Sequence, residues 1–102
     1  MFSLMNEAEV IKIASRFLNG AGRLQAVPVK QEKKIELLDF VSLKFELDHR
    51  YSEKEVNEIL KELYDDFPYL RRLLIENDYL DRNSATGTYW KLERISPDAN
   101  KV

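Results

Sequence analysis

The chain has 102 residues, with 16 Lys and Arg against 18 Asp and Glu, so its formal net charge is −2. With no Cys and a single His, it excludes disulfides, thiol catalysis and metal sites built from Cys or His clusters. The length is that of about one domain, and 44% hydrophobic residues suffice for a folded core. No segment reaches the ~18 apolar residues of a membrane span, and the first residues lack the features of a signal peptide, so we expect a cytoplasmic protein.

Two helices are predicted in the N-terminal half. The first covers about residues 6–19, because Asn6 and Glu9 have the spacing of a capping box and Gly20 provides a stop. The second covers about residues 31–45 and carries apolar side chains on more than one face. We therefore expect the second helix to lie in the centre of the fold, against the first helix and the elements that follow.

A second pair of helices follows, and its beginning is the clearest signal in the chain. Ser52 and Glu55 form an S-x-x-E capping box, which predicts a helix from about Ser52 to Tyr64. The next helix is predicted over residues 67–77, because the two aspartates before it supply a new cap. Two helices joined by a turn of about three residues are typical of a helix-turn-helix.

The C-terminal third of the chain predicts a β-hairpin. Residues 79–82 and 88–92 are β-prone and flank a polar loop that contains Gly87. The short segment at residues 50–51, before the third helix, is a candidate third strand. A helix-turn-helix followed directly by a hairpin has the element order of a winged helix, in which the hairpin is the wing.

The expected fold class is therefore α+β: a winged helix-turn-helix-like domain with an additional N-terminal helix and a C-terminal hairpin wing. No internal repeat or low-complexity segment divides the chain. We expect a single domain over residues 1–95, with its core at about residues 31–93. Residues 96–102 are polar and are expected to form a flexible tail.

Several runs of residues carry a family resemblance, namely RYSEKEVNEIL (50–60), DDFPYLRRLL (65–74), LDR (80–82) and GTYW (87–90). Together with Gly22-Arg23-Leu24, they are similar to the bacterial family known as domain of unknown function 2087, over about residues 10–93. The resemblance implies a winged-helix-type fold and a role in transcriptional regulation, because some members carry the domain behind a separate helix-turn-helix regulator domain. The biochemical activity of the family is not established. This chain departs from the pattern at Asp78, where members usually have Gly.

The fourth predicted helix carries the best candidates for DNA contact, which are Tyr69, Arg71 and Arg72. In a winged helix the exposed face of this helix enters the major groove, where Arg pairs with guanine and both Arg and Tyr reach phosphate. Adjacent helix residues point about 100° apart, so the two arginines cannot do the same job. The alternative is that at least one arginine forms a structural pair with Asp65, Asp66 or the acidic third helix.

The predicted hairpin adds Arg82 and Lys91 as candidate DNA contacts. The alternative is an ordinary solvated hairpin. Tyr89 and Trp90 alternate across the second strand, and the single Trp is expected to face the core. His49 is expected to be an ordinary surface residue.

No arrangement of residues in the sequence indicates catalysis. Asp65 and Asp66 are expected to cap a helix and not to bind metal, because no third ligand type stands near them. No serine has a neighbouring histidine–acid pair, and no glycine-rich phosphate loop is present. We therefore do not expect an enzyme, a cofactor or a metal.

The leading functional prediction is a DNA-binding transcriptional regulator that contacts double-stranded DNA. The alternative is a protein–protein interaction module that uses the winged-helix scaffold without binding DNA. Its partner surface would be the acidic third helix, and apolar N-terminal residues such as Phe2 would support a homodimer. The glutamates of that helix are Glu53, Glu55, Glu58 and Glu62.

Overall fold

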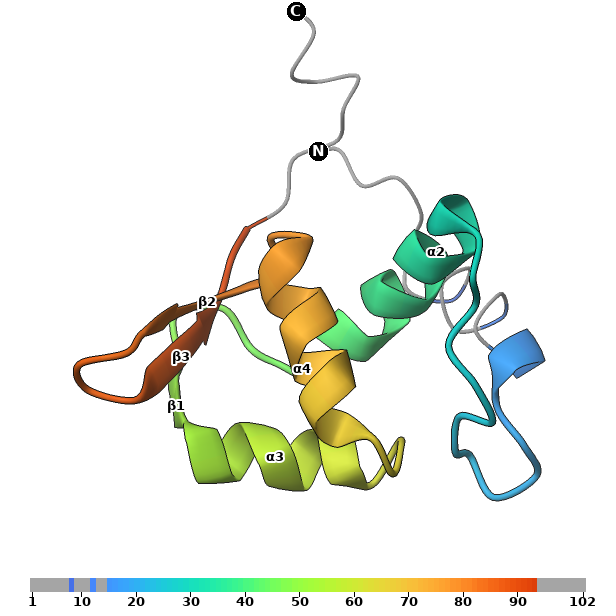
Figure 1. Cartoon of the computed structure of the whole chain (residues 1–102), viewed down its shortest axis with the longest axis horizontal. Coiled ribbons are helices and arrows are strands. Elements are labelled where there is room, and N and C mark those ends of the chain that lie inside the picture. Colours follow the sequence, from blue (N-terminus) through green and yellow to red (C-terminus); the bar gives the residue numbers. More distant parts are fainter. Residues whose placement is uncertain (1–7, 9–11, 13–14, 94–102) are drawn as a thin grey trace, which may run out of the picture.

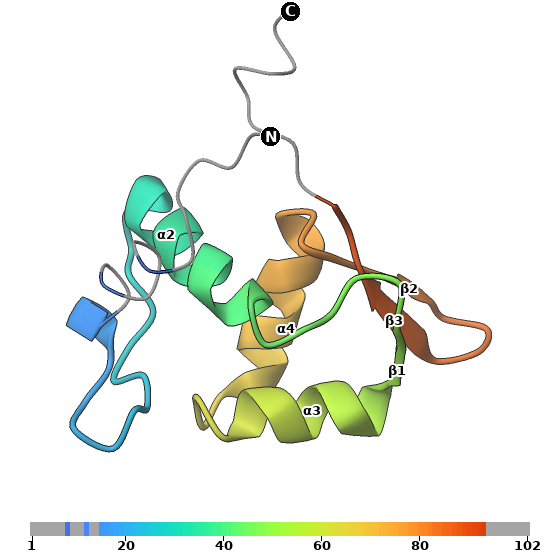
Figure 2. The same cartoon turned by 180° about the vertical axis from the view of Figure 1, so that it is seen from behind.

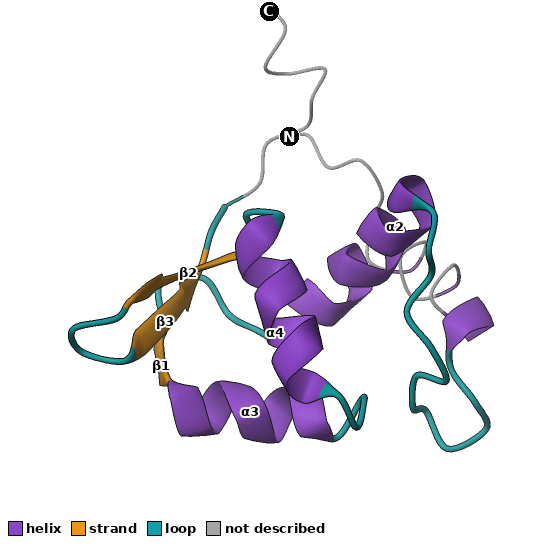
Figure 3. Cartoon of the chain, in the orientation of Figure 1, coloured by secondary structure: helices purple, strands orange, loops and turns teal. Residues whose placement is uncertain are grey.

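The computed structural model describes residue 8, residue 12 and residues 15–93, which form an α+β fold (Figures 1 and 3). Among these residues are three α-helices, a 3₁₀ helix and a three-stranded antiparallel sheet that ends in the β2–β3 hairpin, so the α+β prediction is confirmed. The elements in chain order are η1 (Ser15–Phe17), α2 (Gln31–Ser42), β1 (Arg50–Ser52), α3 (Glu53–Lys61), α4 (Phe67–Glu76), β2 (Leu80–Asn83) and β3 (Thr88–Lys91).

The N-terminal predictions fall mostly outside the described residues. Of the helix predicted at about residues 6–19, Ala8 and Lys12 are described and have helical conformation. Residues Ser15–Phe17 form η1. The tail predicted at residues 96–102 lies wholly outside the described part of the chain.

A turn after η1 ends the helical segment earlier than predicted. Leu18 forms an antiparallel bridge with Leu24, so the helix does not reach Asn19. The cause is the Asn19 side chain, whose Oδ1 accepts hydrogen bonds from the backbone N–H groups of Ala21 and Arg23 at 2.8 and 3.0 Å. A side chain of this kind offers the backbone an alternative to the helix.

Helix α2 is central, but it ends at Ser42, short of the predicted end near residue 45. The backbone N–H groups of residues 43–45 donate to carbonyls three residues earlier, which is the tighter pattern of a 3₁₀ turn. Leu37, Leu38 and Val41 have no exposed surface, and α2 packs against α4. The prediction that this helix lies in the centre and contacts elements that follow it in the chain is thereby confirmed.

Both helices of the C-terminal pair begin at the predicted caps. At α3, the Ser52 hydroxyl accepts a hydrogen bond from the N–H of Glu55 at 3.1 Å, and the Glu55 carboxylate accepts one from the N–H of Ser52 at 2.8 Å. At α4, Asp66 Oδ1 accepts a hydrogen bond from the N–H of Tyr69 at 3.3 Å. α3 ends at Lys61, earlier than predicted, and packs against α4.

The sheet has the order β1-β3-β2, with antiparallel neighbours throughout, and β1 confirms the candidate third strand. Tyr89 of β3 pairs with Tyr51 on one side and with Arg82 on the other, so these three residues share a face. Tyr51 and Tyr89 are buried, whereas Trp90 is half-buried on the opposite face. The prediction that Trp90 faces the core is therefore wrong, because strand pairing gives the inward position to Tyr89.

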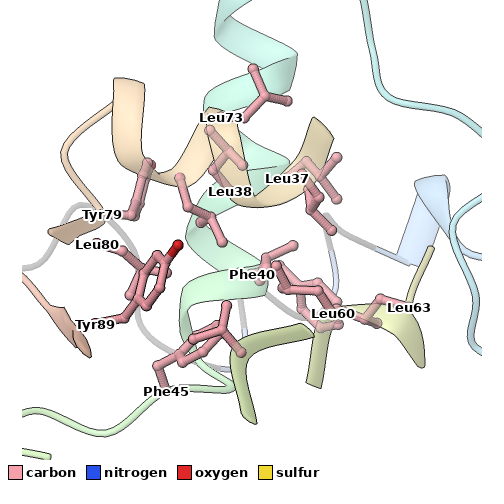
Figure 4. Packing of buried hydrophobic residues seen from close by; sticks show 14 of the residues in the cluster. Leu37, Leu38, Phe40, Phe45, Leu60, Leu63, Leu73, Tyr79, Leu80 and Tyr89 are labelled. Atoms are coloured by element: carbon pink, nitrogen blue, oxygen red, sulfur yellow. The ribbon is translucent and has the colours of Figure 1, made fainter. Parts of the chain in front are cut away.

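The core lies between the helices and one face of the sheet (Figure 4). Seen from either side, η1 lies at one end of the molecule and the hairpin at the other, and α2 runs from the η1 end to the middle, where it meets α4 (Figure 2). No helix among the described residues is long and apolar enough to cross a membrane. The largest fully buried side chains are Tyr79, Tyr89, Leu37, Leu38, Leu60, Leu70, Leu74, Leu80, Val41 and Val56.

Candidate nucleic-acid interface

The two adjacent arginines of α4 have different environments. Arg71 is half-buried, and its guanidinium donates a hydrogen bond to the side-chain oxygen of Asn57 on α3. Arg72 is exposed, and within the described part of the chain its side chain has no hydrogen-bond or ion-pair partner. One of the two arginines is therefore held by the third helix, as the alternative had it, but its partner is the neutral side chain of Asn57 and not a carboxylate. Arg71 braces α4 against α3, whereas Arg72 is exposed on the outer side of α4.

The rest of the outer surface of α4 is mixed in character. Tyr69 is half-buried and packs against the core, so its ring supports the helix. Pro68 and Glu76 are exposed. Glu76 stands four positions after Arg72, but among the described residues no ion pair joins them. One cation and one anion thus lie exposed on this helix.

Arg23 binds the carboxylate that was considered a partner for the α4 arginines. Its guanidinium donates to the backbone oxygens of Lys61 and Glu62 at 3.0 and 2.9 Å and lies 2.5 Å from a carboxylate oxygen of Asp65. These carbonyls belong to the end of α3, where a helix leaves oxygens without internal partners. This role of Arg23 is not predictable from the sequence, because Arg23 and Asp65 stand 42 positions apart and no spacing rule relates them.

The charged side chains of α3 separate in part around the helix axis: Glu53 lies on the same side as the lysines, where its carboxylate accepts a hydrogen bond from the Tyr89 hydroxyl at 3.0 Å, and Glu58 lies between the two sides. Each residue advances by about 100°, so Lys54 and Lys61 lie within about 60° of Asn57, which faces α4. On the same geometry Glu55 and Glu62 lie about 140–160° from Asn57. These two lysines and two glutamates are exposed. The lysines of α3 are therefore nearer to α4, and these two glutamates point away from it.

Arg82 lies in β2, close to the loop of the hairpin. Its guanidinium has no hydrogen-bond or ion-pair partner among residues 15–93. The loop is closed by the carbonyl of Asn83, which accepts hydrogen bonds from the N–H groups of Gly87 at 2.8 Å and Thr86 at 3.2 Å. Gly87 has a φ of +67°, the left-handed region that favours glycine. The loop thus has a defined shape, and Arg82 is presented beside it.

Lys91, the other hairpin candidate, is not brought together with Arg82. In the register of the hairpin, Lys91 pairs with Leu80 and Arg82 pairs with Tyr89. The half-buried Lys91 ammonium donates to the carbonyl oxygen of Phe45 at 3.1 Å. This bond ties β3 to the segment that follows α2, so the charge of Lys91 is directed to the protein itself.

The outer face of the sheet carries a cation–π pair that the sequence analysis missed. The Arg50 guanidinium lies 4.3 Å from the ring centre of Trp90, its cross-strand neighbour. This pair depends on the β1–β3 register, which places Arg50 opposite Trp90, and no local pattern in the sequence predicts that register. His49 is exposed, as expected, and its ring lies 4.4 Å from that of Tyr51.

The fold and surface described so far define a class: an α+β domain in which a helix, a strand, two helices joined by a short turn and a hairpin follow one another. A family profile described as "Uncharacterized protein conserved in bacteria (DUF2087)" matches residues 23–91, from Arg23 to the last residue of β3. The chain belongs to this family. Searches of the curated proteins and of the solved structures find no significant match.

Proposed function

We propose that the chain is a DNA-binding domain of the winged-helix type, with a role in transcriptional regulation. The element order α2-β1-α3-α4-β2-β3 and the sheet order β1-β3-β2 support this assignment. In this class the second helix of the helix-turn-helix lies in the major groove. Here that helix is α4, and the β2–β3 hairpin is the wing.

The observation that carries the proposal is the exposed and unpartnered Arg72 on α4. A protein of net charge −2 binds DNA only if its cations gather on one surface. Arg71 is held by Asn57 beside it, and Lys54 and Lys61 lie on the flank of α3 nearer to α4. These cations lie on the helix that the fold would insert into DNA or on the side of α3 next to it.

Each candidate contact has a distinct role in the proposal. Arg72 reaches a guanine edge or a phosphate, since a guanidinium binds both in bidentate geometry. Arg82 binds phosphate from the hairpin, and the Tyr69 hydroxyl binds phosphate beside α4. Arg71 positions α4 through Asn57. Lys91 is left out of the proposed contacts, because the carbonyl of Phe45 holds its ammonium.

The test is fluorescence anisotropy of a labelled random-sequence duplex at about 50 mM salt, where non-specific binding is tighter than its usual Kd of about 1–100 µM at physiological salt. We expect the Arg72→Ala/Arg82→Ala variant to bind about ten-fold more weakly, because it loses two phosphate or base contacts. The matched control is Arg16→Ala/Lys30→Ala, which removes the same charge from exposed positions outside α3, α4 and the hairpin.

Circular dichroism of each variant checks that the fold is retained. Absence of binding by the unmodified chain at low salt would overturn the proposal. Equal losses of affinity in the Arg72/Arg82 variant and in the control would also overturn it, because binding would then depend on net charge alone.

A further inference from the structure

A groove runs along the side of α3 that faces away from α4. It has a volume of about 690 Å³ and lies between α3, the C-terminal end of α2 and the loop at residues 21–22. Its position is distinct from the proposed DNA-binding surface, because no residue that lines it belongs to α4 or to the hairpin, and Glu55, Ile59 and Glu62 lie about 140–160° from Asn57 around the axis of α3. The groove therefore requires an explanation of its own.

The floor of the groove is apolar and its wall along α3 is acidic. Ile59 and Leu63 contribute the floor, with Ile59 half-buried and Leu63 5% exposed. Glu55, Glu58 and Glu62 line the wall. Glu55 caps α3 through Ser52, whereas the carboxylates of Glu58 and Glu62 have no hydrogen-bond or ion-pair partner among the described residues.

One cation lines the groove, and it does not neutralise the wall. The Lys44 ammonium lies 5.4 Å from the ring centre of Phe40, in a cation–π contact. No ion pair within the described residues joins Lys44 to the glutamates of the wall. With three carboxylates and one ammonium, the groove keeps a net charge of −2.

We propose that this groove docks a basic amphipathic helix of a partner protein. Glu58 and Glu62 are one helical turn apart, which is about 6 Å along the axis of α3. Lysines four positions apart on a partner helix have the same spacing, and apolar side chains between them would cover Ile59 and Leu63. DNA does not fit this site, because its phosphates would meet three carboxylates.

The chain would then join two partners through opposite sides of α3: DNA near α4, and a basic helix in the groove. The proposal does not depend on DNA binding, since no residue of the groove is among the proposed DNA contacts. Each of the two proposals can therefore fail without the other.

The test uses a labelled synthetic peptide of about 18 residues that forms an amphipathic helix with Lys at i and i+4 and Leu on the apolar stripe. We expect it to bind at about 50 mM salt and to weaken at about 150 mM salt, because screening reduces the attraction. Glu58→Gln/Glu62→Gln should weaken binding about three- to ten-fold, as expected for two exposed charge pairs. The matched control Glu32→Gln/Glu93→Gln should leave the affinity unchanged.

Amide chemical-shift mapping on the full chain locates the peptide, and shifts at Gly22, Ile59 and Leu63 are the expected result. A matched peptide with Glu in place of Lys should not bind. Three outcomes would overturn the proposal: no binding of the Lys peptide, shifts centred on α4, or equal binding by the Gln variant and its control. Finally, sedimentation equilibrium of the chain alone measures its oligomeric state. A dimer that dissociates in the Glu58/Glu62 variant would assign the groove to a second copy instead.

Discussion

At the scale of single residues, Leu60 shows how much of the stability depends on complete burial. It has no exposed surface at the centre of the core, and truncating such a leucine removes contacts and leaves a cavity. We expect Leu60→Ala to lower the free energy of unfolding by about 2–5 kcal/mol. Leu43→Ala is the control, because Leu43 is 38% exposed at the end of α2 and should lose less than about 1 kcal/mol. Urea unfolding followed by circular dichroism measures both, and equal losses would contradict the core described here.

Asp78 lies where the chain leaves α4 and has a φ of +63°, in the left-handed region that favours glycine. The N–H of Asp78 donates to the carbonyl of Ile75, and that of Tyr79 to the carbonyl of Leu74, which completes a Schellman motif. The departure from the family pattern at this position therefore retains the cap. It does so at a cost in backbone strain.

We expect Asp78→Gly to raise the free energy of unfolding by about 0.5 kcal/mol, because relief of strain exceeds the added entropy of the unfolded chain. Asp81→Gly, in strand β2, should instead lower it by about 0.5–1 kcal/mol. Urea midpoints that move in the same direction for both variants would contradict the role of the left-handed cap.

Residues 89 and 90 show why the alternation of a strand can be predicted correctly while the residue that faces the core is predicted wrongly. The alternation of Tyr89 and Trp90 across a strand follows from the sequence, but which of the two faces the core does not. That choice depends on the pairing of Tyr89 with Tyr51 of β1, nearly 40 positions earlier, and with Arg82 of β2. The large apolar side chain of Trp90 favoured its placement in the core, whereas the strand register places it on the outer face.

At the scale of elements, the capping box of α3 is the feature that the sequence predicts most directly. Both of its hydrogen bonds are present, so removing the hydroxyl leaves a backbone N–H of the first turn without its partner. We expect Ser52→Ala to lower the free energy of unfolding by about 1 kcal/mol. Ser84→Ala, in the exposed hairpin loop, should change it by less than about 0.5 kcal/mol. If thermal or urea unfolding shows no difference between the two variants, the cap does not stabilise α3.

Elements were predictable where a local signal marks them, and less so where partners come from a distance. The starts of α3 and α4 follow from Ser52, Asp66 and their neighbours within three positions. The end of α2 does not, because its last turn tightens into a 3₁₀ pattern without a Gly or Pro to mark it. The bracing of α4 was foreseen as a pair with α3 or the aspartates. Which arginine would pair, and with which residue, required the packing of two helices.

At the scale of the whole molecule, composition and surface give different expectations. A net charge of −2 argues against DNA binding, but the net charge does not show where on the surface the charges lie. Across α3, Lys54 and Lys61 lie nearer to α4, while Glu55 and Glu62 line the groove. If both proposals hold, the two sides of one helix bind partners of opposite charge, and the anion on the α4 side, Glu53, is held by the Tyr89 hydroxyl.

The salt dependence of DNA binding tests this division across the molecule. Each phosphate contact contributes about −0.9 to the slope of log Kobs against log salt concentration. If Arg72 and Arg82 both bind phosphate, the Arg72→Ala/Arg82→Ala variant should have a slope shallower by about 1.8. Glu58→Gln/Glu62→Gln should leave the slope unchanged, because the groove contacts no phosphate and its charges are screened beyond about 8–10 Å. If the arginine variant binds more weakly but keeps the slope of the unmodified chain, these arginines contact base edges and not phosphates. If the glutamate variant changes the slope, the two sides of α3 are not independent.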